Sequence, residues 1–167
     1  FYACGGLTVL NLPDSLTEIR DYAFRKCTEL KTVNFSAGLK TVGESSFYGC
    51  EKLTELKLPE GVTDIKGYAF KGCIGVTTIT LPSTLKTMGE SAFYGCTGIT
   101  KIEIPKNVTT VGAYAFSRCS KLSQVTFKGN APTIGDYAFA KVTAKISYPS
   151  GNATWSKDKQ QSYGGTL

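Results

Sequence analysis

Apolar positions recur along this chain with a period of 23 residues. Phenylalanine occupies one position of every period, and cysteine follows three residues later in six of the seven periods. The phenylalanines are Phe1, Phe24, Phe47, Phe70, Phe93, Phe116 and Phe139, and the cysteines are Cys4, Cys27, Cys50, Cys73, Cys96 and Cys119. Such a regular repeat is typical of a solenoid, in which successive coils stack and bury one continuous apolar core.

A segment in which apolar and polar residues alternate marks the start of each coil. Leu53, Leu56 and Leu58 form the pattern L-x-x-L-x-L, and other coils repeat it with valine, isoleucine or phenylalanine. Alternation at period two with branched side chains predicts a half-buried strand. Because equivalent segments of successive coils lie side by side, we expect these strands to form one parallel sheet.

The rest of each coil predicts a second wall and a turn. A proline such as Pro59 follows the strand in several coils, and a short apolar segment, Val62 and Ile65 in that coil, predicts an extended segment opposite. Glycine follows this segment at Gly43, Gly89, Gly112 and Gly135, where we expect a bend with a positive φ. The next segment, Ala-Phe-x-x-Cys, predicts a helical or 3₁₀ turn that points Phe and Cys inward.

Tyrosine follows a longer period of 46 residues. Tyr22, Tyr68 and Tyr114 occupy one position, and Tyr2, Tyr48 and Tyr94 occupy a position three residues later. Residues three apart share a face of a helical turn, so successive coils are expected to offer a ring from alternating sides. Two interpretations stay open: staggered packing on the convex surface, or a functional ribbon of tyrosines.

These positions together resemble the BspA-like, or treponemal, type of leucine-rich repeat. One coil shows the motif at Leu58-Pro59, Val62-Thr63, Ile65, Ala69-Phe70, Cys73, Val76 and Ile79. The resemblance covers residues 1–149. It implies a right-handed curved coil stack with a parallel concave sheet, and short helical or 3₁₀ turns or short strands on the convex side. It also implies a bacterial surface or secreted location, a link to adhesion or host contact, and no catalytic residues.

The ends of the chain carry their own expectations. We expect one domain of seven coils over residues 1–149 and a C-terminal cap with a polar tail over residues 150–167, in which Trp155 lies across the open end of the core. Residues 157–167 are polar and expected to be partly disordered. The chain opens within a repeat, which suggests a processed or truncated product. Phe1, Leu7 and Leu10 have no matching lid, which predicts an end-to-end homodimer.

Composition narrows the function classes. The net charge is +6, but lysines and arginines are scattered and alternate with carboxylates, so nucleic-acid binding is not predicted. No apolar run is long enough for a membrane span. Histidine is absent, which removes the commonest general base and most catalytic zinc sites. We therefore predict no enzyme activity and no cofactor.

The six cysteines allow two interpretations. An even count in an extracellular protein favours disulfides. Equivalent residues of parallel coils, however, point their Cβ atoms the same way and leave them about 4.8 Å apart, whereas a disulfide needs roughly 3.8 Å. Val142 fills the seventh position, so an aliphatic group satisfies the same site. We therefore predict buried free thiols, and cysteines arranged in a line cannot surround a metal ion.

The leading functional hypothesis is a non-enzymatic protein-binding module, surface-exposed or secreted, whose partner is a protein such as a host extracellular protein. The outward residues of the concave strands are the predicted contact residues: Thr32, Asn34, Glu55, Lys57, Thr78, Thr80, Lys101, Glu103, Gln124 and Thr126, with Val9 and Asn11 in the first coil. The alternatives are a structural spacer that presents another domain, and a module for cell-wall carbohydrate.

Overall fold

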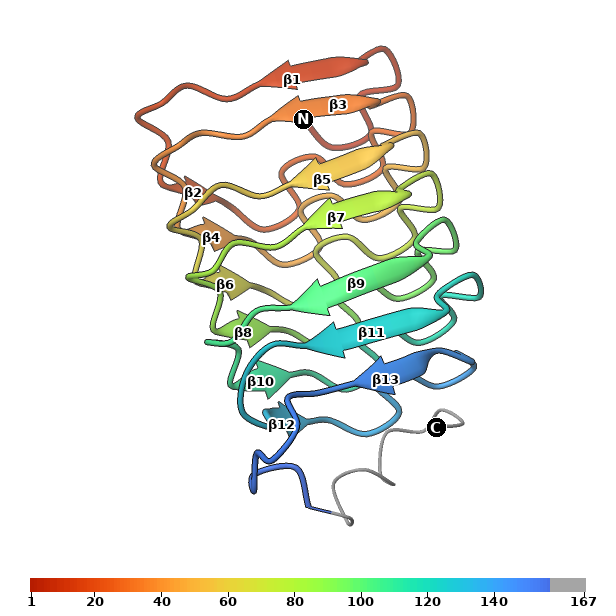
Figure 1. Cartoon of the computed structure of the whole chain (residues 1–167). Coiled ribbons are helices and arrows are strands. Elements are labelled where there is room, and N and C mark those ends of the chain that lie inside the picture. Colours follow the sequence, from red (N-terminus) through yellow and green to blue (C-terminus); the bar gives the residue numbers. More distant parts are fainter. Residues whose placement is uncertain (157–167) are drawn as a thin grey trace.

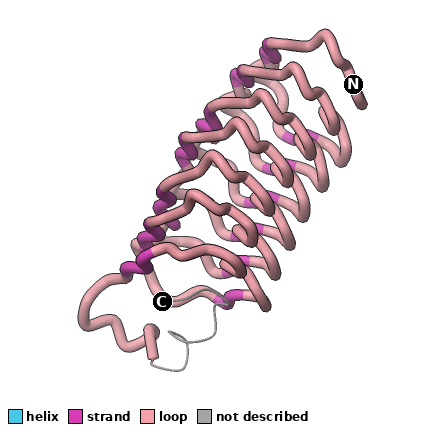
Figure 2. Tube along the Cα trace, turned by 90° about the vertical axis from the view of Figure 1, so that its right-hand side faces the viewer, coloured by secondary structure: helices cyan, strands magenta, loops and turns pink. Residues whose placement is uncertain are grey.

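The protein is a stack of similar coils, which a computed structural model describes over residues 1–156 (Figures 1 and 2). Each coil contributes one longer strand to one wall, and the first six coils contribute a two-residue strand to the opposite wall. Turns join the two walls, and residues 1–156 contain no helix. The predicted coil stack with a parallel sheet and short strands opposite is therefore confirmed.

The longer strands are β1 (Val9–Asn11), β3 (Thr32–Asn34), β5 (Glu55–Lys57), β7 (Thr78–Thr80), β9 (Lys101–Ile104), β11 (Gln124–Phe127) and β13 (Lys145–Ser147). We call their outward surface the long-strand face; it belongs to the wall for which the resemblance to BspA-like repeats implies concave curvature. All pairings are parallel, but they form three separate ladders, β1-β3, β5-β7 and β9-β11-β13. The single predicted sheet is therefore interrupted between β3 and β5 and between β7 and β9.

The opposite wall is continuous. Its strands are β2 (Glu18–Ile19), β4 (Thr41–Val42), β6 (Asp64–Ile65), β8 (Thr87–Met88), β10 (Thr110–Val111) and β12 (Thr133–Ile134), and they form one six-stranded parallel sheet. Partner residues are 23 positions apart, as in the pair of Ile65 with Met88. This register keeps equivalent apolar residues of successive coils in contact.

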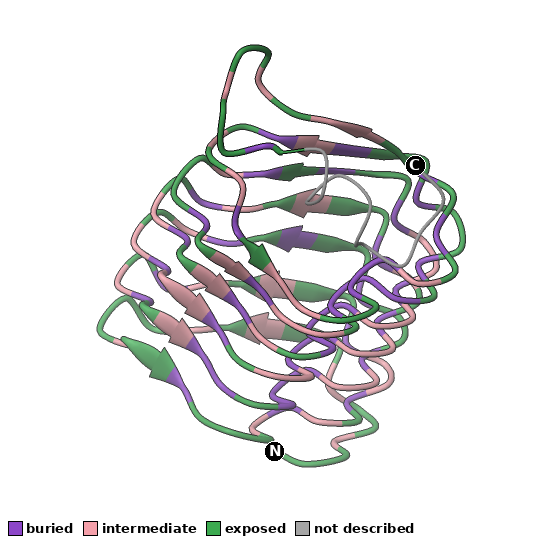
Figure 3. Cartoon of the chain, turned by 90° about the horizontal axis from the view of Figure 1, so that it is seen from below, coloured by how far each residue is buried: buried purple, intermediate pink, exposed green. Residues whose placement is uncertain are grey.

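The core is a column of phenylalanine rings between the two walls. Consecutive rings from Phe1 to Phe139 lie 5.2–5.6 Å apart, with interplanar angles of 6–19°. Phe47, Phe70, Phe93 and Phe116 have no exposed surface. Figure 3 shows that buried segments recur at similar places from coil to coil. The column confirms that the repeated phenylalanines point inward, as the sequence predicts.

The segment Ala-Phe-x-x-Cys is a run of turns, so the prediction of a helical or 3₁₀ turn is wrong in this detail. The N–H groups of Tyr22, Phe24 and Lys26 donate to carbonyls of the next coil, at 2.7–2.8 Å. Only the intervening N–H groups bond within the segment, to the carbonyl three residues earlier. Tyr22 and Lys26 have φ values of 58° and 59°, which interrupt a right-handed helix. Bonding between coils therefore replaces helical bonding.

The glycines after the short strands are needed for close approach and not for a positive φ. None of Gly43, Gly89, Gly112 and Gly135 has a φ in the left-handed region, which corrects the prediction. A Cβ atom at each would lie 2.4–2.5 Å from a backbone atom of the preceding coil. A side chain at any of these four positions would not fit unless the backbone moved. The positive φ values fall later in the coil, at residues such as Tyr68 and Gly72.

The cysteines line the core beside the phenylalanines as free thiols. From Cys27 onward, each of the five buried thiols donates a hydrogen bond to the carbonyl of the phenylalanine 26 residues earlier, at 3.1–3.2 Å. Burial raises the pKa of Cys50 and Cys119 to about 12 and that of Cys73 well above its usual value. These contacts support the packing role predicted for the thiols.

Trp155 packs onto the last coils, and the expected division into a coil domain over residues 1–149 and a cap from residue 150 stays a prediction. Its indole is 5% exposed, lies 4.9 Å from the Tyr148 ring and 4.7 Å from the Phe127 ring, and donates to the Gly129 carbonyl. The expected disorder of residues 157–167 lies outside the described residues. In the first coil Phe1 is 79% exposed, whereas Leu7 and Leu10 are half-buried. The end-to-end homodimer stays a prediction.

Candidate binding site

The structure places all ten predicted contact residues on the long-strand face. They belong to β3, β5, β7, β9 and β11, and all are exposed except Thr126, which is half-buried. Apolar residues between them, such as Leu56 and Ile102, point into the core. The alternation read from the sequence therefore assigns inward and outward positions correctly, and the binding role of the outward residues stays a proposal.

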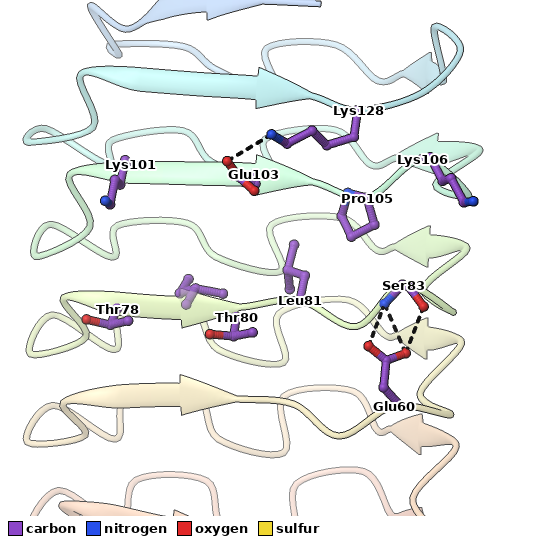
Figure 4. Close-up of a pocket in the computed structure, with 11 residues that line it drawn as sticks. Glu60, Thr78, Thr80, Leu81, Ser83, Lys101, Glu103, Pro105, Lys106 and Lys128 are labelled. Carbon is purple, nitrogen blue, oxygen red and sulfur yellow. Dashed lines mark hydrogen bonds and ion pairs between the residues drawn. The ribbon is translucent and has the colours of Figure 1, made fainter.

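A hollow of about 610 Å³ brings four of these residues together. It lies where the ladder is broken between β7 and β9, and it is lined by Thr78 and Thr80 from β7 and by Lys101 and Glu103 from β9 (Figure 4). The other six predicted residues lie outside it. Its remaining lining residues, which sequence reasoning missed, are Glu60, Ile79, Leu81, Ser83, Pro105, Lys106 and Lys128.

The break in the ladder explains the apolar floor of the hollow. Ile79 in β7 and Leu81 just after it are half-buried, whereas the equivalent Leu56 in β5 and Leu58 just after it are buried. Thr78 and Thr80 are short side chains and leave the space above them open. The hollow therefore combines partly exposed aliphatic groups with polar walls, as small binding sites commonly do.

Both glutamates of the hollow are held by neighbouring groups. The backbone N–H of Ser83 donates to both Glu60 carboxylate oxygens at 3.1 Å, and the Ser83 hydroxyl donates at 2.9 Å. These hydrogen bonds lower the pKa of Glu60, because they favour its charged form. The Glu103 carboxylate lies 3.0 Å from the Lys128 ammonium group. The Glu103 charge is thus paired with a cation, whereas the Glu60 carboxylate is held only by neutral hydrogen-bond donors among residues 1–156.

Two lysines of the hollow have no such partner. Among residues 1–156, no carboxylate lies within 4.0 Å of the ammonium group of Lys101 or Lys106. Figure 4 shows these lysines at opposite ends of the hollow, with Glu103 between them. The lining carries three lysines and two glutamates, a net charge of +1. The hollow therefore has two lysines without an ion-pair partner at its ends, and one hydrogen-bonded carboxylate, that of Glu60, which keeps its negative charge.

The tyrosine ribbon forms a separate column with cations between its rings. The Arg25 guanidinium lies 4.6 Å from the Tyr48 ring centroid, and the Lys71 ammonium group lies 4.6 Å from that of Tyr94. The Tyr22 hydroxyl donates to Glu44, whose charge raises the pKa of Tyr22. Rings and cations therefore pack against each other within the chain, while Tyr2, Tyr22 and Tyr114 keep exposed surface, and both interpretations of the tyrosines stay open.

Metal and membrane chemistry receive no support from the described residues. In residues 1–156, no three His, Cys, Asp or Glu residues lie close enough together to hold a metal ion. No helix in that part of the chain is long and apolar enough to cross a membrane.

Solved structures of bacterial proteins share the fold. A leucine-rich repeat protein from Bacteroides ovatus is 26% identical with a TM-score of 0.67, and the match covers 88% of this chain and 47% of that one. One from Eubacterium ventriosum is 27% identical with a TM-score of 0.65, covering 90% and 34%. The leucine-rich repeat protein of T. pallidum is 21% identical with a TM-score of 0.73, covering 96% and 86%. This chain thus spans about half of the first protein and a third of the second.

The comparison with curated proteins found no match. The family model of the BspA type leucine-rich repeat region matches in six copies, over residues 1–66 and 42–158. These matches include every coil and the phenylalanine and cysteine positions that define the repeat. The chain therefore belongs to the BspA-type leucine-rich-repeat family.

Proposed function

We propose that this chain is a non-enzymatic protein-binding module of a bacterial surface or secreted protein, with a role in adhesion or host contact. The observation that carries the proposal is the hollow on the long-strand face, where exposed polar and charged side chains stand on a fully packed core. Leucine-rich repeat domains typically mediate protein interactions. A rigid core holds the outward side chains in place and so lowers the entropy cost of binding.

The test reverses four charges on the long-strand face. The variant E55K/K57E/K101E/E103K keeps the net charge and changes only exposed side chains. It should bind host extracellular proteins more weakly, because each reversed side chain would now face a partner charge of the same sign. Binding is measured by surface plasmon resonance against a panel of purified proteins. The thermal midpoint should be nearly unchanged, since exposed charges contribute little to stability.

Other outcomes favour other sites or functions. Binding that survives the charge reversal but is lost in Y48A/Y94A would move the contact to the tyrosine column. Binding to cell-wall carbohydrate in place of protein would support the glycan alternative; the hollow has no aromatic lining residue for a sugar to stack on, which weighs against it. A chain that binds no protein or glycan, while a neighbouring domain of a longer protein does, would be a structural spacer.

A further inference from the structure

The break between β7 and β9 leaves backbone hydrogen-bonding groups directed toward the hollow. The Leu58 N–H donates to the Thr80 carbonyl at 3.1 Å, so the Thr80 backbone points toward β5. Neighbouring residues of a strand direct their backbone groups to opposite sides, and those of Ile79 therefore point toward β9.

The edge of β9 that faces β7 also directs backbone hydrogen-bonding groups toward the hollow. The Lys128 N–H donates to the Ile104 carbonyl at 3.0 Å, so the Ile104 backbone points toward β11 and that of Glu103 points toward β7. In residues 1–156, β7 pairs only with β5, and β9 pairs only with β11. Because β7 and β9 stay within 8 Å of each other, a further strand does not fit between them, and a ligand of the hollow would lie across its outer surface.

The charges of the hollow match a peptide of a particular length. Lys101 begins β9, and Lys106 lies two residues beyond its end at Ile104. The strand is extended from Lys101 to Ile104, and Lys106 follows in a turn, so the Cα atoms of the two lysines lie at most about 16 Å apart at roughly 3.3 Å per residue. An extended peptide with acidic residues about five positions apart would place one carboxylate near each lysine.

We propose that this hollow binds an extended acidic segment of a protein partner. Two carboxylates pair with Lys101 and Lys106, and an apolar side chain between them rests on Ile79 and Leu81. This deepens the proposed function and rests on it, since it names the chemistry of the partner at the same face. A peptide fits better than an anionic polysaccharide, because no aromatic side chain lines the hollow for a sugar to stack on, whereas Ile79 and Leu81 offer an aliphatic floor for an apolar side chain.

The experiment selects ligands without assuming their sequence. The full chain is immobilised at low ionic strength, and a displayed library of random heptapeptides is selected against it. The peptides that enrich should carry aspartate or glutamate near both ends and an aliphatic residue between. Synthetic copies of the enriched peptides are then measured by fluorescence polarisation against the chain and its variants, with a thermal melt of each variant as the folding control.

Two variants, each lacking two positive charges, distinguish binding in the hollow from general electrostatic attraction to a basic protein. K101Q/K106Q removes the two lysines without an ion-pair partner and should weaken binding roughly tenfold, as expected for two partly exposed ion pairs. K121Q/K145Q makes the same change at exposed lysines outside the hollow, which are not among the predicted contact residues, and should weaken binding less than twofold. Higher salt should weaken binding to the unmodified chain and to K121Q/K145Q.

Each contrary outcome has a distinct meaning. Equal weakening in both variants, or enrichment without acidic residues, would overturn the acidic-peptide site. Enriched peptides could bind K101Q/K106Q as tightly as the unmodified chain but fail to bind E55K/K57E. That result would overturn the acidic-peptide site and would leave the proposed function standing. Binding of polygalacturonate through Lys101 and Lys106, with no peptide enriched, would replace the peptide by a polysaccharide. No protein partner at all would contradict the proposed function itself.

Discussion

Phe70 is the residue at which the core can be tested most directly. It stands fourth in the column of seven rings, has no exposed surface, and stacks at 5.4 Å on both Phe47 and Phe93. Replacing a buried phenylalanine by alanine costs about 3–5 kcal/mol. Aromatic pairs contribute about 0.5–1.5 kcal/mol each beyond buried area, and Phe70→Ala removes two of them. We therefore expect a loss of about 5 kcal/mol in the free energy of unfolding.

Phe1→Ala is the matched control in the same column. Phe1 is 79% exposed and stacks on a single ring, that of Phe24 at 5.6 Å. The lost burial is therefore small, and we expect a cost of about 1 kcal/mol or less. The contrast between the two variants isolates the effect of position in the column from the chemistry of the substitution.

Urea titration followed by far-ultraviolet circular dichroism and by tryptophan fluorescence gives the free energies. Trp155 is the only tryptophan and packs on Phe127, so its fluorescence reports the C-terminal coils. Because each coil contacts only its neighbours, the two signals should coincide in the unmodified chain and separate in Phe70→Ala. Equal losses in Phe70→Ala and Phe1→Ala, or a loss below about 1.5 kcal/mol in Phe70→Ala, would refute the stacked-column reasoning.

Three further predictions follow from close packing and buried thiols. Gly112→Ala should cost more than about 2 kcal/mol in urea titration, because its Cβ would lie 2.5 Å from the Glu90 backbone nitrogen, whereas Gly67→Ala, with 3.4 Å to the Glu90 carbonyl oxygen, should cost under about 1 kcal/mol. Alkylation in denaturant without reductant should label six cysteines, and labelling of none or two would reveal disulfides. Stability should fall as pH rises from 9 to about 12, because burial raises the pKa of Cys50 and Cys119 to about 12 only in the folded state. The contribution of these thiols to the free energy of unfolding is complete below pH 9 and declines by up to about 1.4 kcal/mol per pH unit per thiol. Cys50→Val should make the decline with pH shallower. An unchanged slope would contradict the assignment of the decline to the buried thiols.

The sequence predicts the stack well because each buried position must repeat. Parallel pairing at 23-residue register brings residue i against residue i+23, as in the pair of Leu56 with Ile79. An apolar side chain that failed to recur would leave a gap beside two neighbours. The column of phenylalanines, the line of cysteines and the alternation on the longer strands follow from that single constraint.

Details of the backbone could not be predicted from the same pattern. The Ala-Phe-x-x-Cys spacing suits a helical turn, but the N–H groups of Tyr22 and Phe24 bond to the next coil. A tyrosine with a φ of 58° is unfavourable in isolation, and repeated bonding between coils holds it there. Glycine before a bend suggests a positive φ, and only the structure shows that a neighbouring backbone excludes a Cβ atom. Contacts between coils determine both the conformation of the turn and the need for glycine, and the sequence of a single coil does not reveal those contacts.

The hollow was beyond sequence reasoning for a different reason. Val76, Ile79 and Leu81 match the apolar pattern of every other coil, so nothing in that pattern reveals that β7 fails to pair with β9. The outward positions of β7 and β9 were identified, but Glu60, Lys106 and Lys128 lie in the segments after the strands. Their part in the hollow depends on where those segments run, which alternation does not specify.

Departures from the repeat point to function, because the packing constraint does not act on outward positions. The position of Lys106 is occupied in other coils by Asp14, Ala37, Glu60, Ser83 and Gly129, so a cation occurs there once among these six coils. In the same coil, Lys101 provides a cation at the start of the strand. These two lysines, one at the start of β9 and one two residues beyond its end, lie beside one of the two breaks between the longer strands. Packing requires neither lysine, and an acidic partner gives both a role.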